Sequence, residues 1–120
     1  DLMESQKSVL KKGGTMRLGA WDCKIQPGTK TSEIYPSTSI SERHRHRYEF
    51  NNDYLDQIFD TDFIIAGKNP ETDLVEIIEY KKHPWFVGVQ FHPEYKSTVS
   101  NPHPLFKGFV QASLAKKLTP

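Results

Sequence analysis

A histidine and a glutamate two positions apart, His92 and Glu94, form the pair in this sequence best suited to chemistry. In extended backbone, residues i and i+2 point to the same side, so both side chains can face one cleft. Pro93 restricts its own backbone and keeps His92 out of helical conformation. A carboxylate that accepts one imidazole N–H leaves the other nitrogen free to activate a thiol or hydroxyl. The alternative is a purely structural role, in which His92 makes its hydrogen bonds at the end of a strand and Glu94 is a solvated loop residue.

The pair ends the clearest strand pattern in the chain, residues 85–92. Its residues alternate between two faces, one formed by Trp85, Val87, Val89 and Phe91 and the other by Phe86, Gly88, Gln90 and His92. The second face becomes smaller and more polar towards its end, as expected where a buried strand opens into a site. Because sites in open α/β sheets lie beyond the carboxyl ends of strands, we expect the pair at such an edge.

The remaining pattern predicts an α/β or α+β fold with a mixed sheet and a closing C-terminal helix. Further strands are expected over residues 15–25, 42–50, 63–67 and 74–80. Residues 1–12 predict a linker or surface loop, and residues 29–41 a loop with at most a short irregular helix. Asn51 and Asn52 can cap a short helix that carries Tyr54, Leu55, Ile58 and Phe59. The terminal helix is expected to bury Leu105, Phe106, Phe109, Val110 and Leu114.

The composition of the chain argues against several classes of function. The chain has 120 residues, of which 16 are basic and 15 acidic, and this balance argues against general capture of nucleic acid or an anionic membrane. The hydrophobic share of 36% is low for a self-sufficient globular domain but well above that of a disordered chain. The length suits either one domain or part of a larger one, and in the second case some apolar stripes are expected to face missing partners. One cysteine, Cys23, excludes an internal disulfide and predicts a cytoplasmic setting. We find neither a membrane-length apolar run nor a signal-peptide pattern.

Residues 85–94, W-F-V-G-V-Q-F-H-P-E, resemble the G-x-Q-F/W-H-P-E signature of class I glutamine amidotransferases. The resemblance implies the C-terminal portion of the glutaminase domain in this family. It also implies a Cys-His-Glu triad, whose cysteine forms a glutamyl thioester and releases ammonia from glutamine. By this resemblance, His92 is the general base and acid, and Glu94 orients it.

The cysteine of this triad is expected to lie outside the chain. In the family it stands in a glycine-flanked G-x-C-x-G turn, which permits a strained strand-to-helix corner. Cys23 lies in W-D-C-K-I without neighbouring glycines, so it is predicted to be an ordinary strand cysteine. We therefore expect the chain alone to be inactive as a glutaminase.

Two further segments resemble CTP synthases: G-G-T-M-R-L-G at residues 13–19 and E-R-H-R-H-R-Y-E-F-N at residues 42–51. The resemblance implies that Arg47 holds the glutamine carboxylate, which suits a guanidinium fork. It implies that a synthetase domain, absent here, uses ATP and Mg²⁺ to phosphorylate UTP, which ammonia then converts to CTP. No cofactor or metal is expected to bind this segment. The whole enzyme is expected to be a cytoplasmic homotetramer.

Arg17, in the first of these segments, has two interpretations. CTP synthases are activated by GTP at the glutaminase domain, so Arg17 is a candidate contact for the GTP effector or for the synthetase domain. The alternative is a structural arginine bonded to a loop carbonyl.

Two competing functions stay open. Another class I amidotransferase or a γ-glutamyl hydrolase would keep the chemistry of His92 and Glu94 without UTP. A non-catalytic module could instead use the Arg/His block for nucleic acid or a metal. Strand alternation separates the arginines of that block from its histidines, which weakens the nucleic-acid interpretation, and interleaved arginines disfavour a divalent cation.

Overall fold

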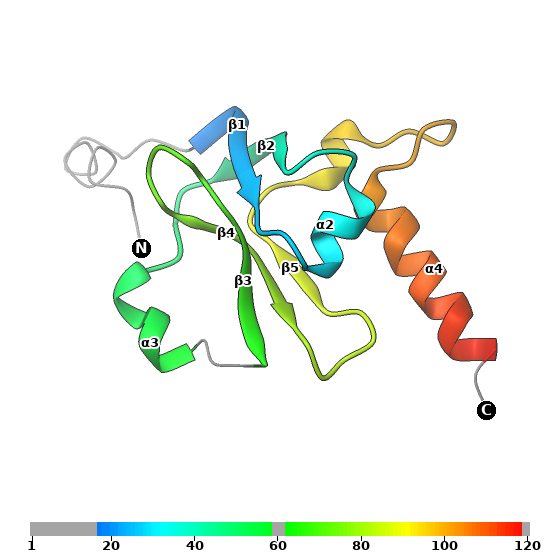
Figure 1. The fold of residues 1–120 in the computed structure, drawn as a ribbon. Coiled ribbons are helices and arrows are strands. Elements are labelled where there is room, and N and C mark those ends of the chain that lie inside the picture. Colours follow the sequence, from blue (N-terminus) through cyan, green and yellow to red (C-terminus); the bar gives the residue numbers. More distant parts are fainter. Residues whose placement is uncertain (1–16, 59–61, 119–120) are drawn as a thin grey trace.

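The computed structural model describes residues 17–58 and 62–118 (Figure 1). Its strands are β1 (Arg17–Ile25), β2 (Ser39–His46), β3 (Phe63–Lys68), β4 (Val75–Tyr80) and β5 (Val87–Val89). Its α-helices are α2 (Lys30–Ile34), α3 (Leu55–Ile58) and α4 (Pro104–Leu118), and two 3₁₀ helices are η1 (Asn52–Tyr54) and η2 (Pro93–Lys96). The linker predicted over residues 1–12 and the predicted helical position Phe59 lie outside the described residues. The fold is thus an α/β unit closed by a C-terminal helix, as the sequence predicts.

The strands form one sheet in the order β2-β1-β3-β4-β5. Every pairing among these described strands is antiparallel, which differs from the expected mixed sheet. The connections explain the difference. β3 and β4 are joined by residues 69–74, and β4 and β5 by residues 81–86, which are too few for the crossover that parallel neighbours require.

The sheet is curled, so that its two edges approach each other (Figure 1). β1 and β3 pair at only two positions, and β3 carries irregular register around Gly67. Beyond β5 the chain leaves β4 and reaches β2, where the His92 N–H donates to the Arg43 carbonyl at 2.8 Å. β5 is therefore shorter than the predicted strand over residues 85–92. The predicted site follows β5, at the meeting of the two edge strands.

The core lies on one face of this sheet. Its buried apolar members are Cys23, Ile25, Ala66, Ile77, Phe91 and Leu105. Trp85, Val87 and Val89, which the sequence predicts to share one face of the last strand with Phe91, pack against this core. Phe86, on the opposite face, is 41% exposed.

The two short helices begin at specific caps. The Thr29 hydroxyl accepts from the Ser32 N–H at 3.1 Å, and the carboxylate of Glu79 from β4 accepts the Lys30 and Thr31 N–H groups at 3.0 and 2.8 Å. These bonds satisfy the donors at the start of α2. The Asn51 side chain accepts from the Asp53 N–H at 2.9 Å, which confirms the predicted asparagine cap.

Helix α4 departs from its prediction. Leu105 is buried, but the other members of the expected buried stripe, Phe106, Phe109, Val110 and Leu114, are 41–57% exposed. The helix approaches the core through Leu105 and Gly108, where an added Cβ would lie 2.5 Å from the Trp85 ring. The rest of the helix extends away from the sheet (Figure 1). These four apolar side chains are therefore largely exposed to solvent, and the expectation that such a stripe faces a missing partner stays a prediction.

Candidate active site

His92 and Glu94 meet as the sequence predicts. His92 Nδ1 lies 2.5 Å from Glu94 Oε1. An ionised carboxylate only accepts hydrogen bonds, so this contact assigns the proton to Nδ1 and leaves Nε2 as the basic nitrogen of a neutral ring. The side chains are 37% and 52% exposed, so the pair lies at the surface rather than in packed interior.

The backbone reaches this contact by a route that differs from the expected one. His92 is extended (φ −107°, ψ 92°) and serves as the N-cap of η2, but Glu94 lies inside this 3₁₀ helix. The prediction that both residues of the pair are extended is therefore wrong for Glu94. Pro93 explains the difference, because its fixed φ suits the first position of a helix as well as a strand. The tight turn brings the carboxylate back to the imidazole.

The electrostatics of the pair favour an ionised glutamate. The hydrogen bond from His92 lowers the pKa of Glu94 below its ordinary value. Glu94 therefore keeps its charge at neutral pH and can stabilise an imidazolium when Nε2 takes up a proton. The pair is therefore an imidazole held in place by an ionised carboxylate.

The segment that carries Arg47 lies beside the His92 segment. Arg47 follows β2 directly and is half-buried. The next residue, Tyr48, accepts at its carbonyl from Gln90 Nε2 at 2.9 Å and contacts His46 Nδ1 at 2.9 Å. Since Gln90 stands two residues before His92, this bond ties the two predicted site segments together. Its long sequence separation explains why the sequence did not reveal it.

Strand β2 also supports the prediction of alternating faces. Arg43 and Arg45 are exposed, whereas His44 is buried and His46 partly buried. The basic block therefore divides into an outer arginine face and an inner histidine face.

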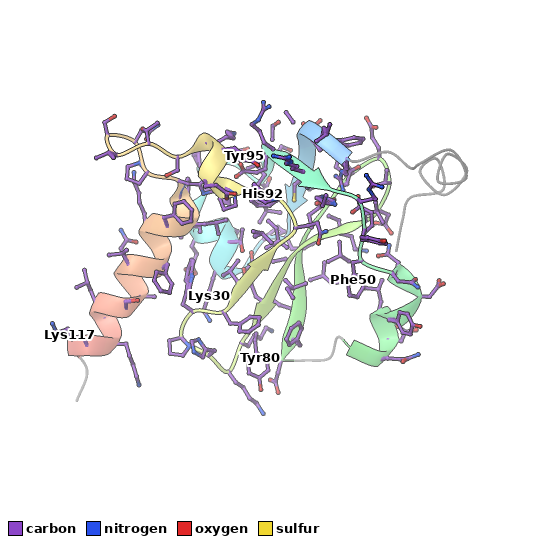
Figure 2. The ribbon with its side chains drawn as sticks, turned by 180° about the vertical axis from the view of Figure 1, so that it is seen from behind. Lys30, Phe50, Tyr80, His92, Tyr95 and Lys117 are labelled. Carbon is purple, nitrogen blue, oxygen red and sulfur yellow. The ribbon has the colours of Figure 1, made fainter. Side chains whose placement is uncertain are left out.

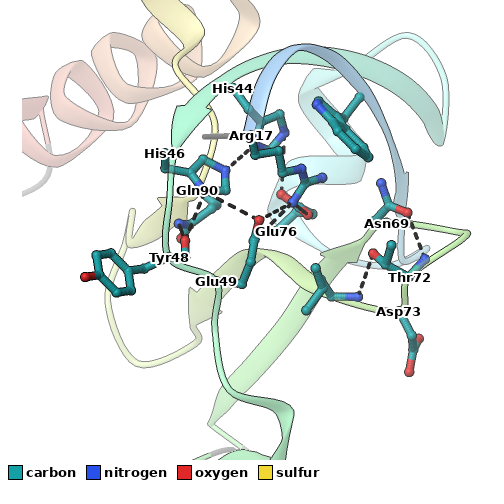
Figure 3. A network of polar contacts seen from close by, with 12 residues as sticks. Arg17, His44, His46, Tyr48, Glu49, Asn69, Thr72, Asp73, Glu76 and Gln90 are labelled. Carbon is teal, nitrogen blue, oxygen red and sulfur yellow. Dashed lines mark hydrogen bonds and ion pairs between the residues drawn. The ribbon is translucent and has the colours of Figure 1, made fainter. Parts of the chain in front are cut away.

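Arg17 lies inside the molecule, at the centre of a buried charge cluster that we define as Arg17, His44, His46, Glu49 and Glu76 (Figure 3). Its Nη1 donates to Glu49 at 3.1 and 3.2 Å and to Glu76 at 2.7 Å. Its guanidinium also lies 4.5 Å from the Trp21 ring centroid. The geometry supports the structural alternative for Arg17, with two carboxylates in place of the expected loop carbonyl. A contact with an effector stays a prediction.

Burial perturbs the titrating members of this cluster. It raises the pKa of Glu76 to about 7, although the Arg17 charge acts in the opposite direction. Burial lowers the pKa of His44 to about 3, and the charge of Arg17 adds to this effect. His44 and His46 are joined through ring nitrogens 2.7 Å apart (Figure 3), so neutral imidazoles can share one hydrogen bond there. The sequence did not reveal this cluster.

Cys23 is a buried thiol of strand β1, 1% exposed, as its sequence context predicts. Burial raises its pKa to about 12, with additional contributions from Glu76 and Glu42. Such a thiol stays protonated at neutral pH, which disqualifies it as a nucleophile.

Residues 17–58 and 62–118 carry neither a candidate metal site nor a candidate membrane span. We find there no group of three or more His, Cys, Asp or Glu side chains placed to hold a metal ion. Within the same residues, no helix has the length and apolar character needed to cross a membrane.

Comparison with known proteins agrees with the geometry. Residues 3–112 match the family Glutamine amidotransferase class-I. The chain is 61% identical over 113 residues to a CTP synthase of Christiangramia forsetii, covering 94% of this chain and 21% of that protein. It is 56% identical over 117 residues to a CTP synthase of Methanosphaera stadtmanae, covering 98% of this chain and 22% of that protein. The chain thus spans about a fifth of the length of these relatives.

A solved structure shows the same fold. The chain superposes on the glutaminase domain of Trypanosoma brucei CTPS, solved with bound acivicin, with a TM-score of 0.85 and 32% identity. The match covers 95% of this chain and 45% of that one.

Proposed function

The chain belongs to the class I glutamine amidotransferases, and on this premise we propose that it supplies the base and its orienting carboxylate for the release of ammonia from glutamine. The observation that carries the proposal is the 2.5 Å contact between His92 Nδ1 and Glu94 Oε1. It leaves Nε2 as the acceptor for a thiol proton. The exposure of both side chains supports the approach of a group from outside this chain.

In the proposed reaction, Nε2 of His92 takes the proton of a cysteine thiol supplied by another part of the protein. The thiolate sulfur attacks the side-chain amide carbon of glutamine. As the carbon–nitrogen bond breaks, the imidazolium returns the proton to the departing nitrogen, which leaves as ammonia. The same base then activates water to hydrolyse the thioester. Glu94 stabilises the imidazolium in both halves of the cycle.

Arg47 is proposed to bind the carboxylate of the glutamine substrate. A guanidinium presents paired N–H groups that match a carboxylate. The bond between Gln90 and the Tyr48 carbonyl supports this role, because it places the Arg47 segment beside that of His92. Replacing Arg47 with Met should raise the KM for glutamine about 10- to 100-fold, as expected for loss of a charge-assisted hydrogen bond. Arg43→Met, on the exposed face of β2, is the matched control.

The whole protein is proposed to be a CTP synthase, because its similar relatives carry that name across almost the entire length of this chain. The ammonia would then aminate UTP that a synthetase domain activates with ATP and Mg²⁺. GTP is the proposed effector, the cytoplasm the proposed location and a homotetramer the proposed assembly. The present chain alone is proposed to be inactive, since the thiol of Cys23 is buried and protonated.

The test is an assay of the full-length protein with glutamine, UTP, ATP and Mg²⁺. The proposal predicts CTP formation together with glutamate release. Release of glutamate without CTP would instead identify another amidotransferase or a γ-glutamyl hydrolase. If neither product formed, a non-catalytic binding module would be the better account.

A further inference from the structure

The imidazole of His92 has an aromatic neighbour that the proposed mechanism does not use. The rings of His92 and Tyr95 are stacked, with centroids 5.1 Å apart and planes inclined by 17°. Figure 2 shows the two side chains together at the η2 turn. The Tyr95 N–H also donates to the His92 carbonyl at 3.2 Å, so the turn itself aligns the rings.

The turn that carries both rings is fastened to β2 at two points. The His92 N–H donates to the Arg43 carbonyl at 2.8 Å, and Lys96 Nζ donates to the Ser41 carbonyl at 2.6 Å. The first bond holds the backbone at His92, and the second holds the Lys96 side chain against β2 just after Tyr95. With the His92 backbone held in this way, the motion of the imidazole comes mainly from its own side-chain torsions.

The hydrogen bond to Glu94 restrains only part of that motion. A single bond at Nδ1 fixes the position of one ring atom but leaves the ring able to tilt about the line joining Nδ1 to Oε1. The imidazole is 37% exposed, so packing provides few other restraints. A ring stacked on the imidazole face opposes this tilt. It also places π-electron density next to the cation that forms when Nε2 takes up a proton.

We propose that Tyr95 is a positioning residue for the glutaminase reaction, whose ring holds the His92 imidazole in the plane in which Nε2 meets the thiol. This inference rests on the proposed function of His92. Tyr95 acts through the imidazole and does not itself touch glutamine. The aromatic ring performs this role, and the hydroxyl is not required.

The chemistry of the step explains which kinetic constant should respond. In the proposed site Arg47 binds the glutamine carboxylate, so the ground-state binding of glutamine should not depend on the imidazole plane. Proton transfer at Nε2 does depend on it, because small misplacements of a catalytic group lower the rate of the chemical step. Loss of the Tyr95 ring should therefore lower kcat while leaving KM for glutamine nearly unchanged.

The experiment compares Tyr95→Leu and Tyr95→Phe in the full-length protein, with CTP formation measured from glutamine and from ammonia. We expect Tyr95→Leu to lower kcat with glutamine about tenfold, which corresponds to about 1.4 kcal/mol in the activation barrier. The KM for glutamine and the rate of CTP formation from ammonia should each change less than about twofold, which is a much smaller change in free energy. Tyr95→Phe should retain near wild-type kcat. Tyr54→Leu, another exposed tyrosine change in η1, is the matched control.

Three results would overturn the inference. One is unchanged kcat in Tyr95→Leu, and another is equal loss in Tyr95→Leu and Tyr95→Phe, which would assign the role to the hydroxyl. The third is a parallel loss of the glutamine and ammonia reactions, which would indicate a structural role. Failure of the proposed function would be distinct, because the wild-type protein would then form no CTP from glutamine.

Discussion

Replacing Arg17 with Met tests the buried charge cluster at its centre. The Arg17 side chain is fully buried, and its carboxylate partners Glu49 and Glu76 are 1% and 0% exposed. Methionine fills similar space but carries no charge, so the two carboxylates would stay buried without their cation. Breaking a buried ion pair in this way costs about 3–5 kcal/mol.

Protonation should reduce this cost. Burial already raises the pKa of Glu76 to about 7 against the opposing effect of Arg17, and it raises the pKa of Glu49 as well. Without Arg17 both pKa values should rise further, and each protonated carboxyl no longer buries a charge. Folding is favoured by protons wherever the folded-state pKa exceeds the unfolded one, so the loss of stability should shrink as pH falls from 8 to 6. We expect Arg17→Met to lower the free energy of unfolding by about 3 kcal/mol at pH 8.

Hydrogen exchange in the full-length protein measures the loss of stability around this cluster, peptide by peptide. Peptides from β1 and β4 should exchange roughly 10²-fold faster in Arg17→Met at pH 8, as a loss of about 3 kcal/mol implies. Arg45→Met, an exposed arginine change on β2, should alter exchange little. Adding Glu49→Gln and Glu76→Gln to Arg17→Met should restore much of the protection, since no buried charge is then uncompensated. Equal exchange in Arg17→Met and Arg45→Met would refute the reasoning.

Two further predictions concern other buried groups. Cys23 should resist alkylation in the native protein at pH 7.5, because burial raises its pKa to about 12, and peptide mass spectrometry should find it modified only after denaturation. Rapid native labelling would contradict this. For His44, burial lowers the pKa to about 3, so the stability that the neutral ring contributes is complete above pH 6.5 and lost progressively below it. The stability difference between wild type and His44→Asn should therefore shrink as pH falls from 7 to 5, and a constant difference would contradict this interpretation.

Local patterns predicted much of the fold. The alternation of the Arg/His block predicted that its arginines and histidines lie on opposite faces of a strand, and the burial pattern of β2 confirms this separation. The asparagine cap before η1 and the two alternating faces of the last strand were also visible in the sequence. Each of these features depends on neighbours within a few residues, where periodicity and capping rules act.

The features that sequence reasoning missed have several physical causes. Arg17 meets Glu49 and Glu76 across 32 and 59 positions, and only the curled sheet brings them together. The stacking of Tyr95 follows from a 3₁₀ turn where extended backbone was expected. The exposed stripe on α4 was missed for another reason. The helical periodicity of its apolar residues predicted burial, but it did not indicate which surface would cover them.

The central claim, that His92 acts as the base of glutamine hydrolysis, is tested most directly by His92→Ala in the full-length protein. The account predicts that CTP formation from glutamine disappears while formation from free ammonia persists, because the synthetase chemistry does not need the imidazole. His83→Ala, at an exposed histidine of the turn between β4 and β5, should preserve both activities. If His92→Ala retained glutamine-dependent synthesis, or lost both activities together, the assigned role would be contradicted.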